Sequence, residues 1–242
     1  MLEKWKEFFK KSEWDKGFSL GKKKMKELLE RVKKDKKEGV NVEALETLEF
    51  YGLPVARYRM VRSKDEIYQV AEELGYPLVL KTVTSKVIHK GDAGAVALGV
   101  FREDVVEAYP SILGEVATRM PWLTLMGVLV QETVEGEERK EVTLERDQKR
   151  PFPFRWITRI FKKDSKKPEK VEQREVGSEE ELSNLMSQDH WEEIYQGMWA
   201  LWLQYPQVRK MELEFIYNPG GSQESHPSSP KVIDAKLFFF EL

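Results

Sequence analysis

The chain has 242 residues and a mass of 28.4 kDa; 40% of its residues are hydrophobic and 34% are charged, which excludes a wholly disordered protein. The absence of cysteine excludes disulfides, iron–sulfur clusters and a cysteine nucleophile. No apolar run is long enough to span a membrane or to act as a secretion signal, so we expect a soluble, cytoplasmic protein with no membrane partner.

The formal net charge of −2 hides two basic segments. Residues 1–38 hold 14 Lys and Arg against 8 Asp and Glu, and residues 145–174 hold 11 against 5. The rest of the chain is therefore acidic. A polyanionic partner would be met by these two segments.

The N-terminal part predicts three helices. Residues 1–19 place aromatic side chains among lysines at spacings that suit a short amphipathic helix, and Gly21 is expected to separate it from a second helix over 22–37. A third helix is expected over 42–51, where glycine and proline then end it.

Helices and strands alternate in the next part of the chain. We expect a helix over 63–74, strands over 78–83 and 95–101, a helix over 105–119 and a strand over 126–133. This alternation predicts a layered α/β or α+β domain.

The C-terminal part predicts further strands and one unusually apolar helix. Strands are expected over 141–145, 154–161, 170–176, 210–217 and 231–240. The helix over 191–205 is apolar around most of its circumference, and residues 238–240 are three consecutive phenylalanines. Such surplus apolar surface predicts a homodimer. Residues 219–230, rich in Gly, Pro and Ser, predict a mobile loop.

Three segments carry a resemblance to a known family. Residues 76–81 read Tyr-Pro-Leu-Val-Leu-Lys, residues 87–96 read Val-Ile-His-Lys-Gly-Asp-Ala-Gly-Ala-Val, and residues 127–132 read Gly-Val-Leu-Val-Gln-Glu. They are similar to the ATP-grasp module of ADP-forming acyl-CoA synthetases, and most of all to the separate β subunit found in archaea. The resemblance implies an ATP-grasp fold with an additional N-terminal helical extension.

The same resemblance implies a division of the chain. Residues 1–21 would form the basic, aromatic extension, residues 22–125 the first subdomain with its helical lead-in, and residues 126–242 the second subdomain. The second subdomain would contain the basic insert 145–174 and the mobile loop 219–230.

The resemblance also implies roles for single residues. His89 would carry the phosphoryl group that passes to ADP, Lys81 would contact the nucleotide phosphates, and Gln131 with Glu132 would receive the adenine. Glu214 and Asn218 would be the remaining magnesium ligands. An active protein of this kind would use ATP or ADP with Mg²⁺ and would need a CoA-binding α subunit.

The sequence departs from the family pattern at the phosphate and metal positions. Residues 151–176 contain no glycine, although the family has a glycine-rich segment there that covers the phosphates. The family's Glu-Leu-Asp-Ile-Asn-Pro segment supplies an Asp and an Asn to magnesium. Here residues 212–216 read Glu-Leu-Glu-Phe-Ile, so Ile216 takes the place of the Asn. We therefore expect weak or vestigial nucleotide binding and no cofactor.

The segment that replaces the glycines combines cations with Phe152, Phe154, Trp156 and Phe161, a combination that suits RNA. Together with the N-terminal lysines it predicts contacts to RNA or a ribosomal subunit. The candidate RNA-binding residues are Arg146, Lys149, Arg150, Arg155, Arg159, Lys162, Lys163, Lys166, Lys167, Lys170, Lys4, Lys6, Lys10 and Lys11.

Three functions fit these observations. The favoured hypothesis is a non-catalytic, degenerate ATP-grasp protein that acts as a binding or regulatory factor on a ribosome or another structured RNA, as a homodimer. The alternative is an active β subunit of an ADP-forming acyl-CoA synthetase. A third hypothesis is a nucleotide sensor that binds through Lys81 and Glu132 without catalysis.

Overall fold

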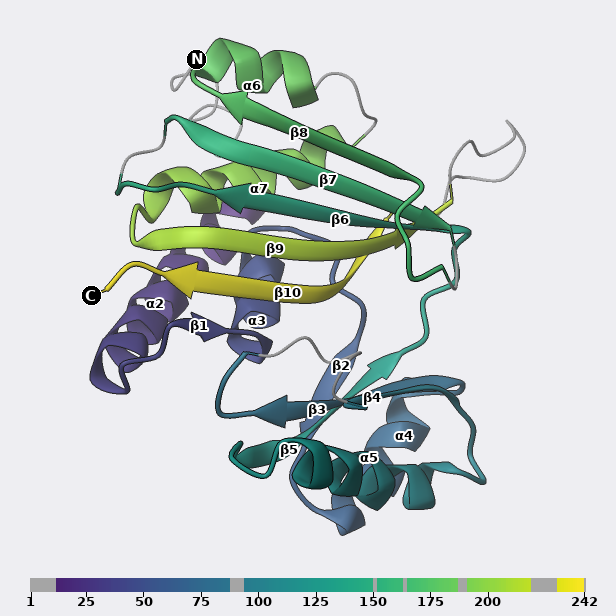
Figure 1. Ribbon diagram of the computed structural model, residues 1–242. Coiled ribbons are helices and arrows are strands. Elements are labelled where there is room, and N and C mark those ends of the chain that lie inside the picture. Colours follow the sequence, from purple (N-terminus) through teal and green to yellow (C-terminus); the bar gives the residue numbers. More distant parts are fainter. Residues whose placement is uncertain are drawn as a thin grey trace. The chain divides into compact units, whose positions relative to one another are not determined.

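The computed structural model in Figure 1 describes residues 12–87, 94–149, 152–162, 165–186, 191–218 and 230–241. The chain forms a small unit, residues 56–135, and a large unit, residues 1–55 with 136–242. Each unit holds an antiparallel sheet with helices packed against it, which confirms the predicted layered α+β class. This division differs from the expected boundary at residue 125, because the strand over 125–132 pairs within the small sheet and the first helices pack in the large unit.

The small unit contains a four-stranded sheet in the order β2-β5-β3-β4. Its core lies between the sheet and two helices on one face, where Leu80 and Val128 meet Ile67 and Ile112. Strand β2 was not predicted from the sequence. The elements are β2 (Tyr58–Val61), α4 (Lys64–Leu74), β3 (Leu78–Thr84), β4 (Val96–Val100), α5 (Val105–Arg119) and β5 (Leu125–Glu132).

The large unit contains a six-stranded sheet in the order β1-β10-β9-β6-β7-β8. Alternate side chains such as Val142, Leu213 and Phe215 are buried on the face that carries the helices. The helices are α2 (Ser12–Lys34), α3 (Val42–Phe50), α6 (Glu179–Met186) and α7 (Glu192–Gln204). The strands are β1 (Gly39–Val40), β6 (Glu138–Glu145), β7 (Phe154–Lys162), β8 (Lys170–Val176), β9 (Val208–Tyr217) and β10 (Lys231–Phe239).

Helix α2 runs through Gly21 without a break, so the predicted separation at this glycine is wrong. A Cβ atom at Gly21 would lie 3.0 Å from Cβ of Phe50 and 3.3 Å from the ring of Tyr51. The glycine therefore lets α2 lie close to α3, and this close packing offsets the low helix propensity of glycine.

The apolar helix α7 is covered within its own unit. Trp199, Leu201 and Trp202 are each at most 3% exposed, and the rings of Phe152 and Phe154 pack on the two tryptophans. The surface that suggested a second copy of the chain is thus already buried. The homodimer stays a prediction, and this helix no longer supports it.

Some expectations concern residues outside the described ranges. They include most of the first helix, with Lys4, Lys6, Lys10 and Lys11, and the loop up to residue 229. Within the described ranges, no helix has both the length and the apolar character needed to cross a membrane.

Candidate functional site

The small sheet has one face that none of the helices of its unit covers. The helices pack on the side of Leu78 and Leu80, so the alternating residues Val79 and Lys81 point to the opposite face. Gln131 of β5 pairs with Val79, and Lys81 pairs with Leu129. Lys81 and Gln131 are therefore diagonal neighbours on this face, within reach of a common ligand.

Gln131 contributes an unsatisfied hydrogen-bond donor to this face. Its side chain is 1% exposed, and its Nε2 has no hydrogen-bond partner among the described residues. Lys81 is 7% exposed. A buried amide without a partner destabilises the fold by about 1 to 3 kcal/mol, so this donor is a candidate for contact with a ligand.

Glu132 has a different environment from the one expected. Its carboxylate accepts hydrogen bonds from the backbone N–H of Arg57 at 3.1 Å and from Arg57 Nε at 2.7 Å. Arg57 also donates to the carbonyl of Leu74. Glu132 therefore joins the end of β5 to the start of β2, and a role in adenine binding remains a proposal.

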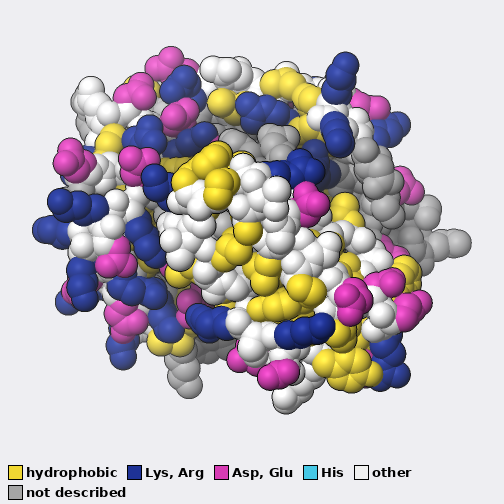
Figure 2. All heavy atoms as spheres, turned by 60° about the horizontal axis from the view of Figure 1, so that its bottom comes forward, with side chains coloured by type: hydrophobic (Ala, Val, Ile, Leu, Met, Phe, Trp, Pro, Cys, Tyr) yellow, Lys and Arg dark blue, Asp and Glu magenta, His cyan; other side chains and the backbone are white. Residues whose placement is uncertain are grey.

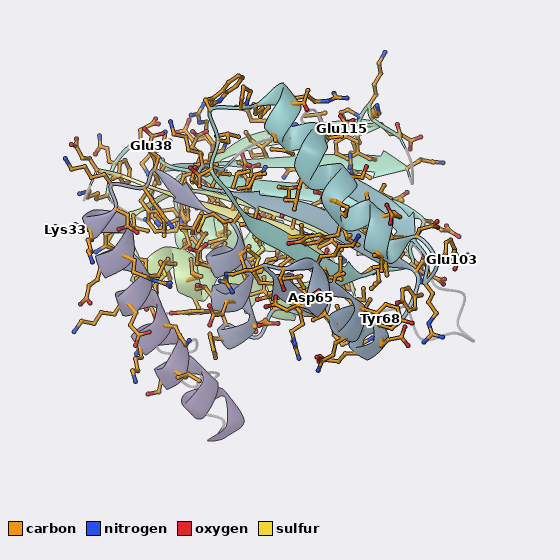
Figure 3. All side chains as sticks on the ribbon, turned by 90° about the horizontal axis from the view of Figure 1, so that it is seen from below. Lys33, Glu38, Asp65, Tyr68, Glu103 and Glu115 are labelled. Carbon is orange, nitrogen blue, oxygen red and sulfur yellow. The ribbon has the colours of Figure 1, made fainter. Side chains whose placement is uncertain are left out.

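His89 lies outside the described residues, but both ends of its segment are defined. On one side, Ser85 exchanges hydrogen bonds with Thr124. On the other, Gly94 lies beside the ion pair of Glu115 and Arg119 near the C-terminal end of α5. Figure 3 shows Glu115 near the end of α5 that is remote from Glu103.

The large sheet has a face covered with charged side chains, opposite to the face on which α7 packs. Lys140 points toward α7, where its Nζ donates to the hydroxyl of Tyr195 at 2.9 Å, so Arg139 and Glu141 point away. Glu214 lies on this charged face in register with Glu141. Its Oε1 is 3.2 Å from Nη1 of Arg139, so an arginine already holds the candidate metal ligand.

Asn218 does not join Glu214 at a common point. It lies just beyond the end of β9, where its Oδ1 accepts a hydrogen bond from the backbone N–H of Glu137 at 3.0 Å. Between the two, on the same face, lies the apolar side chain of Ile216. Across the described ranges, no three His, Cys, Asp or Glu side chains are grouped to hold a metal ion. The residues present do not fit the magnesium ion that the resemblance implies.

Arg139 was not among the candidate site residues, although the sequence holds a signal for it. Along β6, Arg139, Glu141 and Glu145 occupy alternate positions, which is the pattern of a strand with one charged face. Its guanidinium stacks on Phe161, its partner on β7, at 4.1 Å from the ring centroid. The stack could not be predicted because it depends on the register of two strands.

The predicted RNA-binding role of Arg146 is wrong. Arg146 is 2% exposed and donates hydrogen bonds to the backbone carbonyls of Trp202, Tyr205 and Val208. A guanidinium enclosed in the core cannot contact a phosphate on another molecule. Burial lowers its pKa to about 10, which leaves it charged at neutral pH.

Three of the four rings of the basic segment are also not available for base stacking, and the fourth, Phe152, is half-buried. Phe154, Trp156 and Phe161 are each at most 4% exposed, because alternate residues of β7 point into the core or support Arg139. A base can stack only on a ring with an exposed face. In the folded chain these three rings are therefore buried, whereas the described cations of the segment other than Arg146 are not.

Four of the described cations of the segment have acidic neighbours. Arg155 is 3.1 Å from Glu145, and Lys170 is 2.8 Å from Glu172. Figure 2, in which the bottom of Figure 1 comes forward, shows Lys and Arg side chains lying among Asp and Glu on that face of the molecule. Two further ion pairs are longer: Arg159 lies 3.8 Å from Glu141, and Lys162 lies 4.0 Å from Glu169.

The other candidate cations of the segment have different surroundings. Lys149 donates a hydrogen bond to the carbonyl of Glu241, and Lys166 and Lys167 are exposed. Arg150 and Lys163 lie outside the described residues.

Comparison with known proteins identifies the fold family. A model of the ATP-grasp domain matches residues 28–152, more than half of the chain. The chain belongs to the ATP-grasp family. Its two antiparallel sheets, each with its helices, are the ATP-grasp fold that the three sequence segments predicted. Membership of this family gives no support to the expectation that the protein binds no cofactor.

Curated relatives of this ATP-grasp chain are ADP-forming ligases. It is 40% identical over 129 residues to acetate–CoA ligase (ADP-forming) I of Archaeoglobus fulgidus, and 34% identical over 108 residues to the β subunit of the corresponding enzyme of Pyrococcus furiosus. The matches cover 53% and 44% of this chain but 19% and 47% of those relatives. The chain thus spans less than half the length of these two relatives.

A solved structure shares the fold. It is the dinucleotide-forming acetyl-coenzyme A synthetase 1 of Candidatus Korarchaeum cryptofilum in complex with coenzyme A, Ca-AMPCP and HgCl⁺. The TM-score is 0.69 at 23% sequence identity, and the match covers 88% of this chain and 99% of that one. At this identity the likeness shows the ATP-grasp fold alone.

Proposed function

We propose that this chain is the nucleotide-binding, β-type component of an ADP-forming acyl-CoA ligase and acts with a separate CoA-binding chain. The relatives that match half of its sequence are ADP-forming acetate–CoA ligases, and one of them is a β subunit. The proposal corresponds to the alternative function considered from the sequence and replaces the RNA hypothesis.

One observation carries the proposal. The buried Nε2 of Gln131 has no partner among the described residues, and Gln131 lies diagonal to Lys81 on the face of the small sheet opposite α4 and α5. Nε2 can donate to an acceptor nitrogen or oxygen of a nucleotide base, and a lysine ammonium can bind a phosphate. Donors of both kinds on one sheet face suit a nucleoside diphosphate better than an uncharged metabolite.

His89 is the proposed acceptor of the phosphoryl group. The resemblance of residues 87–96 to the family's histidine segment supports this role. A neutral imidazole nitrogen can form a bond to phosphorus while the phosphorus–oxygen bond of the phosphoryl donor breaks; attack by a terminal oxygen of ADP then breaks the nitrogen–phosphorus bond and forms ATP. The flanking strand β3 ends at Thr84, which places this segment beyond the strand that carries Lys81.

The RNA hypothesis lacks a specific observation in its favour. Of its candidate residues, Arg146 is buried and Arg155 is paired with an acid, and three of the four rings, those of Phe154, Trp156 and Phe161, are buried. Neither of the two ligases nor the synthetase structure described above is named for RNA or ribosome binding. We therefore do not retain RNA as a proposed partner.

The proposal is tested by ATP formation from acetyl-CoA, phosphate and ADP after the chain has been copurified with a CoA-binding chain from the same cells. We expect activity in the wild type and none in His89→Ala, because the acceptor nitrogen is removed. His190→Ala is the matched control and should stay active. Equal activity of wild type and His89→Ala would refute the assigned role of His89.

A further inference from the structure

The end of the strand that carries Gln131 is closed by a ring of hydrogen bonds with Arg57. Gln131 is the last residue but one of β5 and pairs with Tyr58, the first residue of β2. At the next position the N–H of Glu132 donates to the carbonyl of Arg57 at 3.0 Å. The N–H of Arg57 donates in return to Oε1 of Glu132 at 3.1 Å. A side-chain carboxylate thus takes the place of a main-chain acceptor at the end of the ladder.

The guanidinium of Arg57 adds two contacts to this ring. Its Nε donates to Oε2 of Glu132 at 2.7 Å, and its Nη2 donates to the carbonyl of Leu74 at 2.9 Å. Leu74 is the last residue of α4, where a carbonyl has no partner within the helix and needs another donor. One arginine therefore joins the start of β2, the end of β5 and the end of α4, all within the small unit.

Glu132 and Gln131 point to opposite faces of the small sheet. Glu132 pairs with Leu78, whose side chain lies in the core beneath α4 and α5. Gln131 pairs with Val79 and points to the face opposite these helices. The contact of Arg57 with Leu74 places the carboxylate of Glu132 on the helix side as well. A ligand on the side chain of Gln131 is thus separated from that carboxylate by the sheet.

The carboxylate of Glu132 depends on Arg57 for its charge balance. The side chain of Glu132 is only 12% exposed, whereas that of Arg57 is 61% exposed. Without the guanidinium, a largely buried negative charge would lose the positive charge that faces it, and the end of β5 would have to move to admit water. Gln131 is the adjacent residue, and a hydrogen bond from its amide weakens steeply with distance and angle. The ion pair therefore controls the position of that amide.

We propose that Arg57 and Glu132 are positioning residues that hold the amide of Gln131 in place for the nucleotide, and that the side chain of Glu132 does not itself contact the base. The inference rests on the proposed nucleotide-binding function and deepens it. It divides the adjacent pair Gln131 and Glu132 into a residue that contacts the ligand and a residue that supports it.

The test is calorimetric titration with ADP of the whole chain as wild type, Arg57→Gln, Gln131→Leu and the double variant. We expect Arg57→Gln alone to weaken binding by about fivefold or more, because the amide loses its alignment. In the Gln131→Leu background the same substitution should cause no further loss, because no amide remains to be positioned. A loss of equal size in both backgrounds would mean that Arg57 only supports the fold, and the inference would be wrong.

Glu132→Gln is the second variant, in case Arg57→Gln folds poorly. It keeps the size of the side chain and removes the charge that Arg57 faces. It should weaken ADP binding about as much as Arg57→Gln, and only while Gln131 is present. A loss that adds fully to the loss in Gln131→Leu would indicate direct contact of Glu132 with the nucleotide and would overturn the inference.

Arg59→Gln is the matched control. Arg59 is also an arginine of the β2 segment that pairs with a glutamate, since its Nη2 donates to Glu73 of α4 at 2.8 Å and its Nη1 to the carbonyl of Tyr58. These bonds do not reach the end of β5. The substitution should leave the affinity for ADP within about twofold of the wild-type value. A loss equal to that of Arg57→Gln would contradict a specific role of Arg57.

The remaining outcomes separate the inference from the function on which it rests. Wild-type binding of ADP that both Arg57→Gln and Glu132→Gln leave unchanged overturns the inference and leaves the nucleotide-binding function intact. No binding of ADP by the folded wild-type chain overturns the proposed function itself, and the inference with it.

Discussion

The guanidinium of Arg146 stacks on the indole of Trp202 at 3.7 Å from the ring centroid and donates a hydrogen bond to the carbonyl of the same residue. Its other bonds go to the carbonyls of Tyr205 and Val208. One buried arginine thus closes the C-terminal end of α7 and joins it to β9. Carbonyls that remain at the end of a helix need donors, and Arg146 supplies them.

We predict that Arg146→Met lowers the free energy of unfolding by about 2 to 4 kcal/mol, because buried carbonyls lose their donors. Chemical denaturation measures this change. Arg155→Met is the control: Arg155 is largely exposed, and its loss should change the free energy by less than about 0.5 kcal/mol. Equal effects of the two substitutions would mean that Arg146 has no structural role.

Gly197 of α7 marks the closest approach between α7 and the end of α3. A Cβ atom there would lie 2.4 Å from the carbonyl oxygen of Tyr51 and 2.6 Å from Cδ1 of Leu53. Gly197→Ala should therefore destabilise the protein by about 1 to 3 kcal/mol through overpacking. Gly114 of α5 has open space around it, so Gly114→Ala should stabilise by up to about 1 kcal/mol. Thermal melts of both variants should move in opposite directions.

The lowered pKa of the Glu212 carboxyl predicts that the stability of the protein depends on pH. Burial acts to raise the pKa of its carboxyl, but the hydrogen bonds and charges of Lys210 and Lys236 outweigh burial and hold the pKa below its ordinary value. A carboxyl with a lowered pKa stabilises the fold above the pKa it has in the unfolded chain, and this contribution disappears as the pH falls through the folded value.

Glu212→Gln should accordingly cost about 1 to 2 kcal/mol of unfolding free energy at neutral pH. The difference from wild type should shrink progressively as denaturation is repeated at pH values below the ordinary carboxyl pKa of about 4.3, and it should disappear once the pH has fallen through the lower pKa of the folded protein. Glu115→Gln, in an exposed pair with Arg119, is the control and should cost less than about 0.5 kcal/mol at any pH. A difference for Glu212→Gln that does not depend on pH would contradict the assignment.

Gln131 and Thr82 provide a matched pair, since both carry a buried polar atom without a partner in the described ranges, on opposite faces of the small sheet. Gln131→Leu and Thr82→Val should each leave stability unchanged or raise it, because an unpaired polar group is removed. Only Gln131→Leu should weaken ADP binding. If Thr82→Val weakens binding as much, Gln131 has no specific role. Calorimetry with ADP and chemical denaturation give the two readouts.

The sequence predicted those parts of the fold that depend on local patterns. Apolar periodicity gave α5 its observed bounds, Val105–Arg119. Strands β1 and β2 were missed because strands of two and four residues leave too short a pattern. The continuity of α2 through Gly21 was missed because it depends on the approach of α3.

For the site, the sequence identified single residues but not their neighbours. Lys81 and Gln131 were named, and the register of β3 and β5 makes them neighbours. The roles of Arg146, Arg139 and Phe161 depend on burial and on cross-strand register, which composition does not encode. A cluster of cations and rings is therefore ambiguous until the alternation of the strand separates its exposed face from its buried face.

The most direct test of the central claim, that this chain binds a nucleotide at the face of the small sheet opposite α4 and α5, is titration of wild type and Gln131→Leu with ADP. We predict saturable one-to-one binding by the wild type, weakened about tenfold or more when the only donor at position 131 is removed. No saturable heat from the folded wild-type chain, or equal affinities of the two proteins, would contradict it.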